Sequence, residues 1–219
     1  MTTMQPEGLG SGGVRSLEVR WIFPGQLAPA VAGWFGRFPA RTTAFDDVYL
    51  LDPYLPGLSV KVRAGRALEV KAYRGSPGLF EVAGRARGRL ESWQKWSFPC
   101  DQPSQGGCDP AGWRLVSKRR RITWFSRAGG SARSCVPGPG EGSRCAVELT
   151  EIHTGGEAWW TLGYEATGPA SLLRSELQAA ATLVFAQALP GGVELGMDYS
   201  RSYPQWLRRR PDAGSDAEA

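Results

Sequence analysis

Charged residues recur at every second position in several strand-like segments of this 219-residue sequence. Side chains on a β-strand alternate between its two faces, so each such segment presents one charged face and one apolar face. The charged faces carry, segment by segment, Ser16, Glu18 and Arg20; Ser59, Lys61 and Arg63; Glu69, Lys71 and Tyr73; Arg89, Glu91, Trp93 and Lys95; and Thr161, Gly163 and Glu165. Basic side chains favour phosphate groups, and carboxylates favour hard divalent cations. The pattern therefore indicates the chemistry of a phosphate-bearing anion.

Eight segments have the alternation typical of β-strands, and most are bounded by Gly or Pro. They span residues 16–23, 47–52, 58–63, 67–73, 88–98, 115–125, 145–153 and 158–166. Two stretches are amphipathic with helical spacing, one beginning near Pro29 and one running from Gly168 to about Leu189. A last segment, 197–207, carries Tyr199, Tyr203 and Trp206 and is expected to pack on the barrel. We predict a mainly β (α+β) fold: an eight-stranded antiparallel closed barrel, or tunnel, with flanking helices.

The charged strand faces fit two arrangements. In an open antiparallel sheet they would face solvent, while the apolar faces would be buried. In a closed barrel they would line the lumen, and the apolar faces would point outward against the helices. The closed barrel is favoured because both helices need an apolar surface to pack on. A lumen of both charge signs predicts a ligand that combines an anion with a divalent cation.

Composition limits the partners and the location of the protein. A net charge of +5 is compatible with an acidic ligand but too small and too dispersed to predict nucleic-acid binding. No segment approaches the roughly 20 apolar residues of a membrane span. The N-terminus lacks the pattern of a secretory signal, so a cytoplasmic protein is expected. We expect an N-terminal lead at 1–15, a barrel domain at 16–207 and a tail at 208–219.

The four cysteines contain no C-x-x-C pair and are expected to be reduced thiols, with a zinc site or a disulfide as the alternative. They are Cys100, Cys108, Cys135 and Cys145.

The order of these elements resembles that of the CYTH domain, the triphosphate tunnel metalloenzyme superfamily, over about residues 16–207. The first strand of that family carries Glu-x-Glu-x-Lys. Here Ser16-Leu17-Glu18-Val19-Arg20 stands in its place, so that Ser replaces the first Glu and Arg replaces the Lys. The hairpin LSVKVRAGRALEVK resembles the paired basic strands of the family, and SKRRRITWF resembles its later Lys-x-Arg strand. CAVELTEIH and WWTLGYEATG resemble its last two strands.

The resemblance implies a tunnel in which basic side chains hold a triphosphate and acidic ones bind Mg²⁺ or Mn²⁺. By position it implies that substrate is bound by Arg20, Lys61, Arg63, Lys71, Arg119 and Arg121. It also implies metal binding by Glu18, Glu148 and Glu165, with Glu18 and Glu165 catalytic. In SKRRRITWF either Arg119 and Arg121 or Lys118 and Arg120 face inward; the former pair is preferred because Thr123 continues its face. Ser16 lowers the charge and the ligand count of the implied metal site.

The function expected is the binding of a triphosphate-bearing small molecule, inorganic polyphosphate or a nucleotide, in a basic lumen. Metal-dependent hydrolysis makes this an enzyme hypothesis, as a phosphoric anhydride hydrolase. A non-catalytic module of the same fold that binds or senses a polyanion is the alternative, and Ser16 favours it. A lipocalin-like carrier of an apolar ligand is a third alternative, although such a ligand would leave the lumen charges unpaired. No membrane partner is expected, and the oligomeric state is left open.

Overall fold

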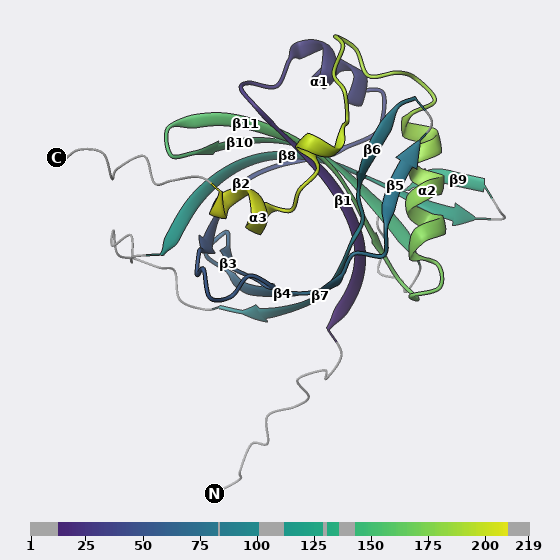
Figure 1. Ribbon diagram of the computed structural model, residues 1–219. Coiled ribbons are helices and arrows are strands. Elements are labelled where there is room, and N and C mark those ends of the chain that lie inside the picture. The colour runs from purple at the N-terminus through teal and green to yellow at the C-terminus, as the bar shows by residue number, and fades with distance from the viewer. Residues whose placement is uncertain (1–12, 83, 101–111, 129–130, 136–142, 210–219) are drawn as a thin grey trace, which may run out of the picture.

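The computed structural model describes residues 13–82, 84–100, 112–128, 131–135 and 143–209. Within them the chain is mostly strand (Figure 1). The strands are β1 (Val14–Pro24), β2 (Arg41–Leu50), β3 (Leu58–Arg63), β4 (Ala67–Gly75), β5 (Leu79–Val82), β6 (Ala86–Arg89), β7 (Glu91–Pro99), β8 (Trp113–Ala128), β9 (Ser131–Cys135), β10 (Arg144–Thr154) and β11 (Glu157–Thr167). The helices are α1 (Pro29–Phe35), α2 (Leu173–Val184), the 3₁₀ turn η1 (Met197–Tyr199) and α3 (Tyr203–Arg208). No helix among the described residues has both the length and the hydropathy that crossing a bilayer requires.

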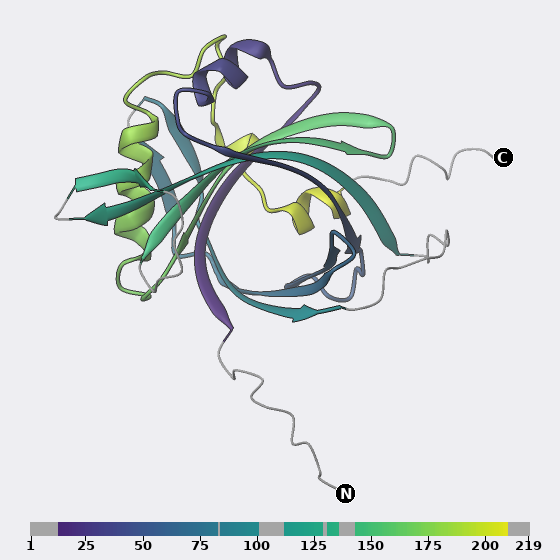
Figure 2. The same ribbon diagram turned by 180° about the vertical axis from the view of Figure 1, so that it is seen from behind.

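Eight strands form a closed antiparallel barrel in the order β10-β11-β1-β7-β4-β3-β2-β8 (Figures 1 and 2). The ring closes because β8 also pairs with β10, from Cys145 opposite Phe125 to His153 opposite Ser117. These are the eight strands that the alternation predicts, so the predicted fold class is confirmed. The short strands β5 and β9 were not predicted, and β2 begins at Arg41 instead of residue 47.

The predicted strand 88–98 is broken at Leu90 into β6 and β7. Only β7 belongs to the barrel, and it pairs with β1 from Val14 to Glu18 and no further. β6 turns away to form a two-stranded sheet with β5. Gly88 permits the close approach of β6 to β1, because a Cβ there would lie 2.7 Å from the Val19 side chain. The second half of β1 therefore pairs with β11 on one edge and has no strand partner on the edge where β7 would continue.

The apolar faces of the strands point outward, where α1 and α2 cover one side of the barrel. Trp21 has no exposed surface and makes edge contacts with Phe80 and Tyr164. Phe35 of α1 and Leu177 of α2 complete this outer core. Burying a large apolar side chain contributes about 1.5–3 kcal/mol. The helices thus stabilise the outside of the barrel and leave the charged faces inside, so the open-sheet alternative is wrong.

The segment before α3 crosses the gap beside β1. Ser200 forms a β-bridge with Trp21, and the Arg201 N–H donates to the Arg20 carbonyl at 3.0 Å. The Ser200 hydroxyl accepts from the Arg89 N–H at 2.8 Å. These bonds connect β1 to β6 through the C-terminal segment.

Inside the barrel, α3 fills one end of the lumen (Figures 1 and 2). Its Trp206 and Leu207 are buried against an apolar floor made by Ile22, Tyr49, Val116 and Ile152. The Arg208 guanidinium donates to the carbonyls of Leu55, Pro56 and Leu58 at 2.8–2.9 Å. The helix is thereby anchored to the β2–β3 connection.

Candidate functional site

The part of the lumen that α3 leaves free is a charged cavity of about 80 Å³. Among the described residues, more basic than acidic side chains line it. The basic ones are Arg20, Lys61, Arg63, Lys71, Arg89, Lys95, Lys118, Arg120 and Arg201, and the acidic ones are Glu18, Glu69, Glu91, Glu148 and Glu165. The excess of positive charge favours an anionic ligand over an apolar one.

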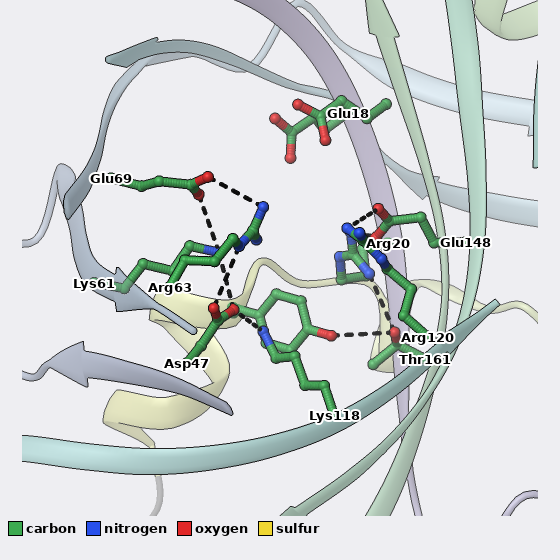
Figure 3. Close-up of polar contacts among 12 residues, drawn as sticks. Glu18, Arg20, Asp47, Lys61, Arg63, Glu69, Lys118, Arg120, Glu148 and Thr161 are labelled. Atoms are coloured by element: carbon green, nitrogen blue, oxygen red, sulfur yellow. Dashed lines mark hydrogen bonds and ion pairs between the residues drawn. The ribbon is translucent and has the colours of Figure 1, made fainter. Parts of the chain in front are cut away.

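One buried carboxylate lies among three cations in the Asp47 cluster, which we define as Asp47, Tyr49, Lys61, Arg63, Glu69 and Lys118. Figure 3 shows its charged members, Asp47, Lys61, Arg63, Glu69 and Lys118. Asp47 Oδ2 is 2.9 Å from Lys118 Nζ and 3.0 Å from Lys61 Nζ, and its Oδ1 is 3.3 Å from Arg63 Nε. Glu69 binds two of the same cations, Lys61 at 3.3 Å and Arg63 at 3.1 Å. Lys118 also donates to the Tyr49 hydroxyl at 2.7 Å.

The electrostatics of this cluster show the cost of burying cations together. Burial by itself would raise the pKa of Asp47, but Lys118, Lys61 and Arg63 hold that pKa well below its usual range. Burial lowers the pKa of Lys61, and the neighbouring Arg63 guanidinium lowers it further. Burial raises the pKa of Tyr49 to about 12, so this hydroxyl stays protonated at neutral pH. The cluster is held together by a carboxylate with more cations around it than it can neutralise.

A second group, the Glu148 cluster, consists of Arg20, Arg120, Glu148 and Thr161 (Figure 3). Both guanidinium groups lie 3.2 Å from the Glu148 carboxylate, and Arg20 also donates to Thr161 at 3.1 Å. Burial would raise the pKa of Glu148, but Arg20 and Arg120 lower it below its ordinary value. Gly163, directly opposite Arg20, is required here, because a Cβ would lie 2.7 Å from the guanidinium.

The reverse arrangement occurs in the Lys71 cluster, defined as Ser16, Glu18, Lys71, Glu91 and Glu165. Lys71 Nζ lies 2.6 Å from Glu18 Oε1 and 3.3 Å from Glu165 Oε1. Ser16 Oγ donates to the same Glu18 oxygen at 2.6 Å. Burial opposes the charge of Lys71, but Glu165 and Glu18 raise its pKa above the ordinary value. One ammonium therefore holds two carboxylates.

The residues expected to bind Mg²⁺ or Mn²⁺ do not form a metal site in this arrangement. Glu18 and Glu165 share Lys71, whereas Glu148 is turned toward Arg20 and Arg120. Across the described part of the chain, no three His, Cys, Asp or Glu side chains are grouped so that they would hold a metal ion. The donor set does not fit a resident divalent cation, and a cation that enters with a polyphosphate would be part of the ligand.

The preferred inward pair of β8 is wrong. Arg119 and Arg121 lie on the outer face around Glu151, at 3.7 and 3.3 Å, whereas Lys118 and Arg120 line the cavity. Thr123 continues the outer face, since it lies opposite Val147 of the outer core. Thr123 is buried under the covering of the barrel and not in the lumen, so the face that it continues is the outer one.

Other predicted residues reach the lumen: Glu18, Arg20, Lys61, Arg63, Lys71, Glu148 and Glu165 all line the cavity. Asp47 and Tyr203 were not predicted to take part. The alternation of Asp47 with Tyr49 in the DVYLLD segment was the available signal for Asp47. For Tyr203 there was no local signal: its ring lies 4.0 Å from Lys118 Nζ and 4.7 Å from the Arg20 guanidinium only because α3 enters the barrel.

Neither of the two cysteines whose side chains the structure describes, Cys100 and Cys145, lines this cavity. Cys145 is buried in the outer core. Cys108 and the side chain of Cys135 lie outside the described residues.

Comparison with known proteins finds similarity in structure alone. No protein-family model and no curated protein matches this chain. One similar solved structure is a conserved hypothetical protein from Pyrococcus furiosus, at 13% identity and TM-score 0.47, covering 86% of this chain and 98% of that one. Another is the S. pombe Pct1 RNA triphosphatase in complex with the Spt5 CTD, at 10% identity and TM-score 0.42, covering 83% of this chain and 88% of that one. Neither carries a function over to this chain.

Proposed function

We propose that this protein binds a phosphate-bearing polyanion, an inorganic polyphosphate or a nucleotide, in the basic part of its lumen. The observation that carries the proposal is the convergence of five cations on three carboxylates in a largely buried space. The cations are Arg20, Lys61, Arg63, Lys118 and Arg120, and the carboxylates are those of Asp47, Glu69 and Glu148. Buried cations in excess of their partners are costly, so an anion that enters the lumen is stabilised by them.

The shape of the lumen supports a ligand that enters by one end. Because α3 fills the other end, a long polyphosphate could not pass through the barrel. The ligand expected in the lumen is therefore the terminal phosphates of a small molecule. The cavity is small because its walls are bridged by ion pairs. A phosphate group that enters would therefore replace Glu69 and Glu148 as the partner of their cations, and it would accept charge-assisted hydrogen bonds from Arg and Lys.

The catalytic roles of Glu18 and Glu165 stay predictions. Both carboxylates hold Lys71, and the described part of the chain groups no three metal-ligating side chains, so we propose binding as the function. Of the predicted phosphate-binding residues, Arg20, Lys61 and Arg63 keep that role in the proposal. Lys118 and Arg120 replace Arg119 and Arg121.

The test is calorimetric titration with tripolyphosphate, ATP and orthophosphate at fixed ionic strength, in EDTA. We expect one tripolyphosphate per chain, bound more tightly than orthophosphate. Arg120→Gln is expected to weaken binding by about tenfold or more, since a hydrogen bond to a charged group contributes about 1.5–3 kcal/mol.

The matched control is Arg119→Gln, the adjacent residue on the outer face, which should leave the affinity unchanged. Equal losses in the two variants, or no binding by the wild type, would contradict the proposal. Phosphate release with Mn²⁺ that Glu165→Gln abolishes would establish hydrolysis in place of simple binding.

A further inference from the structure

We infer that the ammonium of Lys71 is the resident cation of the carboxylate side of the lumen, where a divalent metal ion would otherwise bind. Polyanion binding then needs no metal ion, a consequence that rests on the proposed function. The inference itself depends only on the arrangement of Glu18, Lys71, Glu91 and Glu165.

Three carboxylates form a row across three neighbouring strands. Glu18 on β1 lies directly opposite Glu165 on β11 and directly opposite Glu91 on β7, and all three line the cavity. Opposite residues in an antiparallel pair have Cβ atoms about 4.5–5.5 Å apart, and like charges there destabilise the sheet. A row of this kind requires a cation between its members.

Lys71 supplies that cation from β4, the strand beyond β7. Its ammonium touches an oxygen of Glu18 and an oxygen of Glu165, the position that a hard cation would take between two carboxylates. The three side chains are only 15–20% exposed, so the contact is largely shielded from water. Ser16 adds a hydroxyl donor where a further carboxylate would add negative charge. Lys71 thus supplies the ammonium in contact with both members of the Glu18–Glu165 pair, and the charge of Lys95 also favours ionised Glu165.

Glu91 shows that the row is built for more charge than one ammonium provides. Its side chain is 5% exposed, and Trp93 donates to its Oε2 at 3.0 Å. Burial and the Glu18 carboxylate raise the pKa of Glu91, whereas hydrogen bonds from Trp93 and the Ser202 hydroxyl favour its ionised form. Glu91 therefore adds a third buried carboxylate directly beside Glu18, and one ammonium offsets the negative charge of the row only in part.

The test is a titration of the protein with Mn²⁺ in the absence of any polyphosphate, in which electron paramagnetic resonance measures the bound metal. The wild type should bind Mn²⁺ weakly or not at all. Lys71→Met should gain one Mn²⁺ site at least tenfold tighter than any in the wild type, and adding Glu18→Gln to that variant should remove it. Lys71→Gln replaces Lys71→Met if the latter does not fold by circular dichroism.

The control is Lys95→Met, which removes the same charge from the residue directly opposite Lys71 on β7. It should gain no site. The inference is overturned if the wild type binds Mn²⁺ as tightly as Lys71→Met does, or if Lys95→Met gains the same site. If tripolyphosphate binds to the wild type neither with nor without metal, the proposed function fails, yet the Mn²⁺ comparison still decides the role of Lys71.

Discussion

The two sides of the lumen compensate their buried charges in opposite ways. In the Asp47 cluster a carboxylate with no exposed surface holds three cations, whereas in the Lys71 cluster one ammonium holds two carboxylates. The first side has positive charge in excess and gains from an added anion. The second already contains the cation that its main carboxylate pair needs. The difference indicates that anion binding and metal binding are separable in this barrel, and that the anion site is the one left open.

The largest expected effect is a loss of folding stability when the carboxylate of the cation-rich side is removed. Asp47→Asn leaves Lys61, Arg63 and Lys118 around a neutral amide, and removing one partner of a buried ion pair costs about 3–5 kcal/mol. Urea unfolding at neutral pH measures the loss. Asp46→Asn, the adjacent exposed residue, should change the free energy of unfolding by about 0.5 kcal/mol or less. Tripolyphosphate should stabilise Asp47→Asn more than the wild type, and an equal loss from both variants would refute the comparison.

A smaller effect concerns the carboxylate-rich side at acid pH. Burial opposes the charge of Glu165, but Lys71 and Lys95 lower its pKa from 4.5 to about 2. A carboxyl group with a lowered folded-state pKa stabilises the fold above its unfolded-state pKa and loses that contribution as the pH falls. The wild type should therefore lose stability between pH 4.5 and 2, and Glu165→Gln should lose less over the same interval. Urea unfolding at a series of pH values tests this, and parallel curves would be evidence against it.

The smallest effect distinguishes the two neighbours of Glu18. Burial raises the pKa of Glu91, and the Glu18 carboxylate adds to the rise. Because its folded-state pKa is raised, ionised Glu91 costs stability at neutral pH, and the cost disappears below the unfolded-state pKa. Glu91→Gln should therefore raise the free energy of unfolding at pH 7, by about 1 kcal/mol or less, whereas Glu165→Gln should lower it. Thermal unfolding of the two variants decides whether their signs differ as expected.

The alternation of residue types was sufficient for the barrel and for most of its lining. A period of two in segments such as SLEVRWIF separates Glu18 and Arg20 from Leu17 and Val19 without further information. The two amphipathic helices then require the apolar faces to lie outside. The alternation could not decide which residues of Lys118 to Arg121 face the lumen, because all four are basic. The pairing of β8 with β10 places Arg119 opposite Glu151 on the outer face and Arg120 opposite Thr150 on the inner face, where Arg120 also meets Glu148.

The sequence by itself therefore determined which side chains alternate, how many barrel strands there are, and that charge lies within. Tertiary structure alone decided the partners of those charges. Asp47 meets Lys61 and Lys118 because β3 and β8 flank β2, and Lys71 of β4 meets Glu18 of β1 and Glu165 of β11 because the barrel curves these strands toward one another. The position of α3 in one end of the barrel is also a tertiary effect, because the segment before it crosses the gap beside β1, which is remote in sequence. Local periodicity follows from the geometry of a single strand, whereas the pairing of buried charges depends on register and ring closure among strands remote in sequence.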